Sequence, residues 1–328
     1  MIPVLVASSL ATLLGVGLIL PILRRARIMD VPNARSSHEA PTPRGGGVAV
    51  VLAMFVGVLV ASVSGRQIEP WAPGVIAVFA ALGLWDDLRD LNVALRLLIQ
   101  LAVSGVVAGA IVGDGSLLAL ATIVISTVWL VGYTNAFNFM DGVNGISALN
   151  AALAGGWYAY LGTTREIETL VVMGAAVTGA ALGFLPWNAP RARVFLGDVG
   201  SYALGATVGT LALLAWDGGV PLLLALAPSV IYVADTGWAF TKRLVSGRAW
   251  HEAHREHVYQ QLTDRGWTHL ASATFAASFA GVACALSDAL VDTSVPALVL
   301  VGGSLVLAYL SAPAILRRVF DSMEMGTN

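Results

Sequence analysis

The chain has 328 residues and a formal net charge of -2, and 57% of its residues are hydrophobic whereas only 12% are charged. A soluble protein carries about 25% charged residues, so this composition excludes an ordinary soluble enzyme and indicates a polytopic membrane protein. The small net charge gives no indication of a nucleic-acid partner, and none is expected. The single cysteine, Cys284, cannot form a disulfide within the chain.

A window of about 20 residues, the length of a membrane-spanning helix, finds eleven apolar segments. They lie near 2–23, 46–64, 71–85, 92–112, 116–134, 146–161, 167–187, 201–216, 219–241, 269–287 and 295–316. Two of them, 71–85 and 146–161, are short for a span, so we expect ten or eleven transmembrane helices. The sequence therefore predicts an all-α fold in which residues 1–328 form a single integral-membrane domain.

The basic residues fall almost entirely on one side of this threading. Of the 18 lysines and arginines, only Arg66 and Arg165 lie in the other set of connections. Because Lys and Arg are retained in cytoplasmic loops, the N-terminus is predicted outside and the C-terminus inside. The cytoplasmic connections are then expected near 24–45, 86–91, 135–145, 188–200 and 242–268.

The first cytoplasmic connection contains the run PTPRGGG, which ends at the start of the second apolar segment. Glycines at a helix start beside Arg44 would admit a phosphate group. A tight re-entry of the chain into the membrane explains the same glycines equally well. Arg44 and His38, which lies in the same loop, are candidate substrate-binding residues.

The second connection begins with two adjacent carboxylates, Asp86 and Asp87. Such a pair at a helix end suits a divalent cation or the deprotonation of a phosphate. The alternative is a solvated loop in which an aspartate caps the following helix.

The third connection presents side-chain amides at Asn135 and Asn138 and a carboxylate at Asp141. A spacing of three stacks these groups along one face of a helix, and Gly142 and Gly145 allow a turn or the close approach of a ligand. A helix end punctuated by glycine is the alternative interpretation.

The fourth connection ends in the run VFLGDVGS, from Val194 to Ser201. Its glycines would place backbone N–H groups near a phosphate, and Asp198 would be available to a cation. Ser201 also suits the N-cap of the eighth span.

The fifth connection carries His251, His254 and His257 at spacings of three, with Arg255 among them. A zinc site usually recruits Cys or acidic ligands as well, so a patch that binds a diphosphate fits this stretch better. A solvated interfacial helix remains an alternative.

Two polar residues lie close to these connections within or beside apolar segments. Asp235 lies about two turns before Lys242 on the ninth span, where it either lines the same cavity or reaches towards Lys242. His269, at the start of the tenth span, is interpreted as structural.

Four acids, namely Asp86, Asp87, Asp141 and Asp198, thus lie at or beside the ends of apolar segments on one predicted face. Carboxylates are costly near hydrocarbon and persist there mainly for function. Their distribution predicts a polar site at the membrane surface.

Taken in order, these motifs resemble the polyprenyl-phosphate N-acetylhexosamine-1-phosphate transferases, which include the muramyl-pentapeptide phosphotransferases and the GlcNAc-1-phosphate transferases. The resemblance covers the chain from Asp30 to about Leu262. It rests on PTPRGGG, the Asp-Asp pair, NxxNxxDGxxG, FLGDxGS and the histidine-rich loop, which occur in the family's order and spacing.

The resemblance implies transfer of a sugar-1-phosphate from a UDP-N-acetylated amino sugar to undecaprenyl or another polyprenyl phosphate, with release of UMP. It also implies the bacterial inner membrane as location, an active site on its cytoplasmic face, and Mg²⁺ as cofactor with Mn²⁺ as an alternative. Asp198 is then the metal ligand, and Asp86 and Asp87 act catalytically with it, near the lipid phosphate or the diphosphate. The remaining candidates bind substrate: Arg44, His38, Asn135, Asn138, Asp141, Asn144, His254, Arg255 and His257.

Two departures from the family pattern bear on which branch of the family the chain resembles. Many relatives carry Asp where Asn144 stands, and the muramyl-pentapeptide enzymes have consecutive histidines instead of the spaced pair His254 and His257. The stretch AHREHVYQQL resembles the branch that begins O-antigen or other cell-envelope glycans. Transfer of GlcNAc-1-phosphate or muramyl-pentapeptide phosphate remains the alternative within the family.

Two function classes outside this family are also compatible with acids in a membrane protein. A cation-coupled transporter would place them at mid-bilayer, and a non-catalytic scaffold would tolerate their loss. A homodimer occurs among members of the resembled family and is a candidate assembly here.

Overall fold

The computed structural model describes residues 1–32, 37, 40–113, 116–247 and 255–326, with side chains up to residue 317. Within these ranges the chain is mainly helical, and its two strands form one short antiparallel hairpin. Its strands are β1, Met29–Asp30, and β2, Thr42–Pro43, and Met29 is paired with Pro43.

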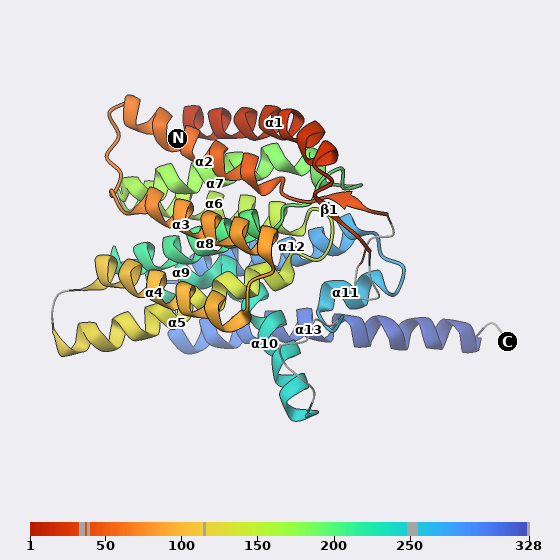
Figure 1. Ribbon diagram of the computed structural model, residues 1–328. Helices are drawn as coiled ribbons and strands as arrows, with labels where there is room; N and C mark the ends of the chain where they lie inside the picture. The colour runs from red at the N-terminus through yellow and green to blue at the C-terminus, as the bar shows by residue number, and fades with distance from the viewer. Residues whose placement is uncertain (33–36, 38–39, 114–115, 248–254, 327–328) are drawn as a thin grey trace.

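The helices follow one another through the whole chain and run largely alongside one another in a layered bundle (Figure 1). They are α1 Ile2–Arg25, α2 Gly47–Val63, α3 Ala72–Arg89, α4 Val93–Val112, α5 Leu117–Met140, α6 Ile146–Thr164, α7 Glu168–Asn188, α8 Asp198–Asp217, α9 Leu222–Leu226, the 3₁₀ turn η1 Ala227–Ser229, α10 Val230–Val245, α11 Val258–Thr263, α12 His269–Leu290 and α13 Val295–Gly326.

The predicted all-α membrane fold is confirmed. Each of the eleven apolar segments coincides with a helix, if α9, η1 and α10 are taken as one passage. Among the described residues, eight helices are long and apolar enough to cross a membrane, and α2 is a shorter apolar helix. Which face of the membrane each end occupies stays a prediction.

At three of the motifs, the helices continue past the apolar runs into residues that were expected in connections. Helix α3 extends through Asp87 to Arg89, α5 extends to Met140, and α8 begins at Asp198. The polar residues at these ends face polar groups of other helices, so the helical backbone continues where a loop was expected. The N-cap of α8 is Gly197, and Ser201 lies inside its first turn.

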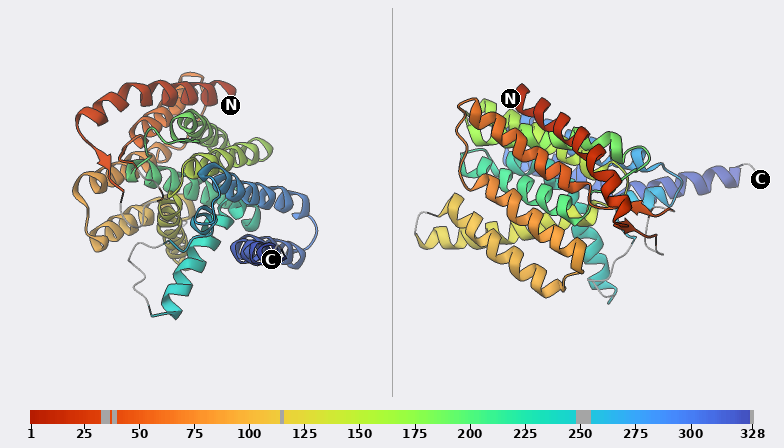
Figure 2. Two further views of the ribbon diagram at one scale, coloured as in Figure 1. Left: turned by 90° about the vertical axis from the view of Figure 1, so that its right-hand side faces the viewer. Right: turned by 45° about the horizontal axis from the view of Figure 1, so that its top comes forward.

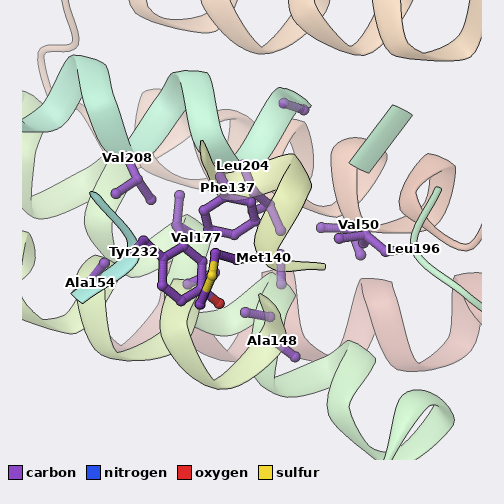
Figure 3. Packing of buried hydrophobic residues seen from close by; sticks show 14 of the residues in the cluster. Val50, Phe137, Met140, Ala148, Ala154, Val177, Leu196, Leu204, Val208 and Tyr232 are labelled. Atoms are coloured by element: carbon purple, nitrogen blue, oxygen red, sulfur yellow. The ribbon is translucent and has the colours of Figure 1, made fainter. Parts of the chain in front are cut away.

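Helix α8 lies at the centre of the bundle and α13 at its edge (Figure 2). In the membrane-length window of α8, 89% of residues are buried, compared with 11% for α13. Figure 3 shows the packing around Phe137 of α5 and Tyr232 of α10, whose ring centroids are 5.4 Å apart. Because lipid tails are as apolar as these side chains, close van der Waals packing of this kind, and not removal from water, holds the helices of the bundle together.

Glycines bring α2 and α3 into contact with the first turn of α8. A Cβ atom at Gly83 of α3 would overlap the carbonyl group of Asp198, and one at Gly47 of α2 would overlap the backbone of Gly200. Only residues without a side chain allow this approach. The three helix ends therefore meet at the start of α8.

The hairpin joins this junction through backbone hydrogen bonds. The N–H groups of Gly45 and Gly46 donate to the Phe195 carbonyl at 3.2 and 2.9 Å, and that of Gly47 donates to the Leu196 carbonyl at 2.8 Å. In return, Phe195 N–H donates to the Pro43 carbonyl at 2.8 Å. The hairpin lies at the same end of the bundle as α11 (Figure 1).

Helix α10 leaves the common direction of the bundle at its C-terminal end, as both figures of the whole chain show. It follows an interruption at η1, which contains Pro228. Proline lacks the N–H group that would continue the helical hydrogen bonds. The passage from α9 to α10 therefore changes direction inside the bundle.

Candidate functional site

A polar cavity of about 290 Å³ opens where the hairpin and these helix ends converge. The described residues that line it are Asp30, Ser37, Arg44, Asn138, Asp141, Gly142, Val143, Asn144, Asn188, Phe195, Leu196, Gly197, Asp198, Gln260 and His269. Five of them are among the site residues expected from the sequence: Arg44, Asn138, Asp141, Asn144 and Asp198.

Asp198, the first residue of α8, faces this cavity with few protein partners. Its Oδ1 accepts a hydrogen bond from Asn138 Nδ2 at 2.8 Å, and the same amide donates to Ser201 Oγ at 2.8 Å. Among the described residues, no other hydrogen bond to this carboxylate is formed. Asn138 therefore orients Asp198 and leaves most of its acceptor capacity to a ligand.

Asp141 lies directly after α5 and lines the same cavity. Burial raises the pKa of its carboxyl to about 6, and the Ser147 hydroxyl opposes this shift. Desolvation disfavours the charged form of an acid, and a nearby cation favours it. A cation between Asp141 and Asp198 would therefore stabilise both carboxylates in their ionised form.

Asp87 is held by the backbone of α8. Its Oδ1 accepts the N–H of Asp198 at 3.1 Å and its Oδ2 that of Val199 at 3.0 Å. Arg44 Nη2 lies 2.9 Å from Oδ1, and the Asp87 side chain is only 6% exposed. Asp87 thus caps the N-terminus of α8 from α3, whereas the helix that follows α3 is capped by Asn92.

Asp86 turns away from the cavity. Its Oδ1 accepts the Leu91 N–H at 2.9 Å, and its Oδ2 accepts from Arg96 Nη1 at 3.0 Å and from the Tyr202 hydroxyl at 2.8 Å. The residue is 4% exposed. It connects α3 with α4 and α8, and both of its oxygens already have protein partners.

Asn135 and Asn138 face different neighbours although both lie on α5. Asn135 Nδ2 donates to Gln100 Oε1 of α4 at 2.6 Å and to the Val131 carbonyl at 2.8 Å. Three residues turn a helix by about 300°, which is short of a full turn. Asn135 therefore lies almost one turn before Asn138 and points in a different direction from it. The structure brings Asn138 to the cavity and directs Asn135 towards α4.

Asn144 and the glycines beside it shape the cavity wall. Asn144 Nδ2 donates to the Pro190 carbonyl at 3.1 Å, and the Gly145 N–H donates to Asn188 Oδ1 at 2.6 Å. Gly145 has φ +87°, a conformation that favours glycine. The Tyr259 hydroxyl occupies the space where a side chain at position 142 would lie. These contacts tie the loop after α5 to the loop after α7.

Most of the backbone amides that were candidates for phosphate binding are already engaged. Those of Gly45, Gly46 and Gly47 donate to the chain around Phe195, and those at the start of α8 donate to Asp87. This favours the tight-packing interpretation of PTPRGGG. Positive charge reaches the cavity through the Arg44 side chain, which is 34% exposed.

The histidine-rich connection is only partly described. His38 and His254 lie outside the described residues. Arg255 pairs with Asp264, and His257 is the N-cap of α11, with its Nδ1 3.2 Å from Asp235 Oδ1. Of this stretch, the described residue that lines the cavity is Gln260.

The cavity residues fit a magnesium ion better than a zinc ion. Asp198, Asp141 and the Asn138 amide supply oxygen atoms, and the described part of the chain contains no group of three or more His, Cys, Asp or Glu ligands. Magnesium is usually held by one or two carboxylates together with substrate phosphates. A structural zinc site needs four protein ligands.

Comparison with known proteins places these features in a family. The sequence model of glycosyl transferase family 4 matches residues 72–215, a range that contains all four acids of the predicted site. The phospho-N-acetylmuramoyl-pentapeptide-transferase of Synechococcus sp. (strain JA-3-3Ab) is 33% identical over 270 residues, which cover 71% of this chain and 75% of that protein. The chain belongs to glycosyl transferase family 4.

Two further relatives of this family 4 protein are named as N-acetylglucosaminyl 1-phosphate transferases. A probable undecaprenyl-phosphate N-acetylglucosaminyl 1-phosphate transferase of Bacillus subtilis is 27% identical over 285 residues, with 81% of this chain and 79% of that protein covered. The undecaprenyl-phosphate alpha-N-acetylglucosaminyl 1-phosphate transferase of Thermotoga maritima is 27% identical over 260 residues, with coverages of 78% and 81%. The family resemblance is confirmed, and these relatives give no support to a transporter.

Sequence reasoning missed several residues of this family 4 cavity. Asp30, Ser37, Asn188 and Gln260 line it, as does His269, which was interpreted as structural. Asn188 ends an apolar span just before a cytoplasmic connection, as Asn138 does, so the same rule would have found it. Gln260 carries no such signal, because it lies in the middle of a polar loop.

Proposed function

We propose that this family 4 protein transfers an N-acetylated amino-sugar-1-phosphate from a UDP-sugar to undecaprenyl or another polyprenyl phosphate. An oxygen of the lipid phosphate forms a bond to the sugar-bearing phosphorus. The bond from that phosphorus to the bridging oxygen breaks, and UMP leaves with that oxygen. The products are a polyprenyl-diphosphate sugar and UMP.

The observation that carries the proposal is the position of Asp198. Its carboxylate faces a polar cavity at one end of an apolar helical bundle, and within the described chain it accepts a protein hydrogen bond only from Asn138. A lipid phosphate and a soluble nucleotide can meet only at such a boundary. Each substrate is anionic, so the site must supply positive charge.

The residues of the cavity divide this task. Asp198 and Asp141 would hold Mg²⁺, which, when bound, neutralises charge that develops on the diphosphate. Arg44 adds a fixed positive group, and Asn138 keeps the Asp198 carboxylate in place. Preorganised charges of this kind are usually the largest contribution to catalysis of phosphoryl transfer.

Asp87 and Asp86 contribute to this reaction chiefly by holding other residues of the site region in place. Asp87 holds the first two amides of α8 and the Arg44 guanidinium, so it sets where Asp198 begins the helix. Asp86 holds Arg96 and Tyr202. Contact of either carboxylate with the lipid phosphate, as the family resemblance implies, would require exchange of these partners.

The cytoplasmic face of the inner membrane is the proposed location of the cavity. The supporting observation is the unequal distribution of basic residues, since 16 of the 18 lie in the connections at the cavity end by the predicted threading. One of the two remaining basic residues, Arg66, forms an ion pair with Glu168. A homodimer is proposed from the resemblance alone.

The proposed sugar donor belongs to the branch that begins O-antigen or another cell-envelope glycan. The spaced histidines 254 and 257 support this choice over the muramyl-pentapeptide reaction. The Bacillus and Thermotoga relatives, whose names specify N-acetylglucosaminyl 1-phosphate, make GlcNAc-1-phosphate transfer the nearest alternative.

The test is UMP release by the purified protein in detergent, with undecaprenyl phosphate, Mg²⁺ and a panel of UDP-sugars. We expect release with at least one UDP-N-acetylated amino sugar and none without the lipid phosphate. Absence of release with every donor in the panel, from protein that elutes as a folded species, would contradict the proposal. The donor that reacts fastest identifies the branch.

A further inference from the structure

A further buried acid, Asp235 of α10, lies outside the cavity and is 1% exposed. Its two oxygens accept the N–H of Val258 at 3.1 and 3.0 Å, and Oδ2 also accepts from the Tyr309 hydroxyl at 2.8 Å. His257 Nδ1 lies 3.2 Å from Oδ1. These groups come from α10, from the start of α11 and from α13.

Both sequence-based interpretations of Asp235 are wrong. It is not among the described residues that line the cavity. Lys242, its expected partner, lies over the ring of Trp238 instead, 5.6 Å from the centroid. The partners it does have come from 22, 23 and 74 residues further along the chain, so no local pattern could indicate them.

The surroundings of Asp235 match the needs of an ionised carboxylate. Such a group only accepts hydrogen bonds, and the Val258 amide, the Tyr309 hydroxyl and a His257 ring protonated on Nδ1 can all donate. An unpaired buried charge is strongly unfavourable, whereas this one has a complete set of donors. Removing its charge would therefore disturb all three partners.

These partners lead directly to the cavity. Helix α11 has only six residues and is too short to be stable alone. At its start, Gln260 Oε1 accepts the His257 N–H at 3.3 Å, and Gln260 lines the cavity. The Tyr259 hydroxyl donates to the Phe139 carbonyl at 3.0 Å, next to Asn138. Asp235 thus anchors the end of α11 that forms part of the cavity wall.

We propose that Asp235 is a positioning residue for the transfer reaction, which acts by fixing His257 and the start of α11 against the Asp198 cavity. The inference rests on the proposed function. Asp235 touches neither substrate nor metal in this assignment. Its effect on turnover passes through His257 and through the wall that Gln260 supplies.

The direct test does not depend on activity. In Asp235→Asn, one acceptor oxygen is replaced by a donor amide, which would face either the Val258 N–H or the Tyr309 hydroxyl. Hydrogen exchange of peptides covering residues 258–263 should become faster by about tenfold or more, since local opening governs such exchange. Asp288→Asn is the matched control, because Asp288 also accepts a tyrosine hydroxyl, that of Tyr160, but on the far part of α12.

Kinetics then show whether the effect passes through His257. Asp235→Asn should lower kcat by about 10- to 100-fold, the range seen when residues that orient functional groups are lost. In a His257→Asn background, the same change should lower kcat by a smaller factor, since the part of the effect that passes through His257 is already lost. Tyr309→Phe keeps the ring beside Phe275 and Phe279 and should give a smaller loss of kcat. It replaces Asp235→Asn in this test if that variant does not fold.

The outcomes separate this inference from the proposed function. Wild-type exchange rates in Asp235→Asn, or equal losses of kcat in both backgrounds, would overturn the positioning role even if the wild-type protein is an active transferase. If the wild-type protein releases no UMP from any donor, the proposed function fails. The exchange experiment would still decide whether Asp235 anchors α11.

Discussion

The end of α3 and the start of α8 both present acids at the boundary of an apolar helix, but the structure uses them differently. Asp86 and Asp87 are 4% and 6% exposed, and every one of their oxygens accepts from a protein group. Asp198 accepts from Asn138 alone within the described chain and faces a cavity. The same residue type therefore serves as a structural anchor in one region and as a ligand-facing group in the next.

The supply of donors explains this difference. Two arginines, a tyrosine hydroxyl and three backbone amides surround the end of α3, so its carboxylates are satisfied without a ligand. Fewer donors surround Asp198 and Asp141. A carboxylate with unused acceptor capacity near an apolar interior is a natural site for a cation.

The largest effect is expected from the ligand-facing side of this comparison. Asp198→Asn should lower kcat by about a thousandfold, because a neutral amide cannot hold the cation that stabilises the reacting phosphates. UMP release from the best donor measures it. Cys284→Ala changes a buried thiol that does not line the cavity. This control should leave the rate of UMP release unchanged. Near-normal turnover of Asp198→Asn would contradict the assignment of Asp198 as a metal ligand.

On the anchoring side, Asp87→Asn should lower kcat by about 10- to 100-fold. One of the two α8 amides loses its acceptor, and the pair with Arg44 is weakened. The concentration of Mg²⁺ for half-maximal rate should stay as in the wild type, since Asp87 is an anchor in this arrangement. A marked rise in that concentration would instead make Asp87 a metal ligand.

Substitution of Asp141, unlike that of Asp87, should change the Mg²⁺ requirement of the reaction. Removal of metal with EDTA should abolish UMP release, and added Mg²⁺ or Mn²⁺ should restore it. In Asp141→Asn, the Mg²⁺ concentration for half-maximal rate should rise by about tenfold, because one oxygen ligand has lost its charge. Titration of the metal in both variants gives the comparison. An unchanged metal requirement in Asp141→Asn would remove it from the ligand set.

The contact between the two regions can be tested without changing a charge. Gly83→Ala should destabilise the protein by about 1–3 kcal/mol, the usual range for overpacking, since the new Cβ overlaps the Asp198 carbonyl. Gly74→Ala on the same helix is the control, because a Cβ there meets no described atom within 4 Å. Thermal unfolding in detergent measures both. Equal melting temperatures would show that α3 and α8 are not tightly apposed there.

The smallest effect on activity is expected at Asn135. Asn135→Ala leaves Gln100 without its partner inside the bundle, which costs about 1–3 kcal/mol of stability. Because the side chain faces α4, kcat should change by less than about twofold, whereas Asn138→Ala should lose far more. A loss of turnover at Asn135 equal to that at Asn138 would place both amides in the substrate site.

The apolar segments, the family and the meeting of several motifs at one cavity could all be predicted from the sequence. The reason is that hydrophobicity is a property of each residue, so a run of 20 such residues indicates a span without knowledge of its neighbours. The resemblance likewise rested on short runs such as FLGDVGS. The helix ends were less predictable, because the polar residues at the ends of α3 and α5 are held by groups of α4 and α8.

Only the tertiary structure decided which polar groups meet. The partner of Asp87 lies 111 residues away at Asp198, and the donors of Asp235 come from the start of α11 and from α13. A hydrogen bond depends on distance and direction at about 3 Å, and neither is encoded in the local order of residues. The sequence by itself determined that acids gather at one membrane boundary, and the packing of α3, α5 and α8 determined which of them faces a ligand.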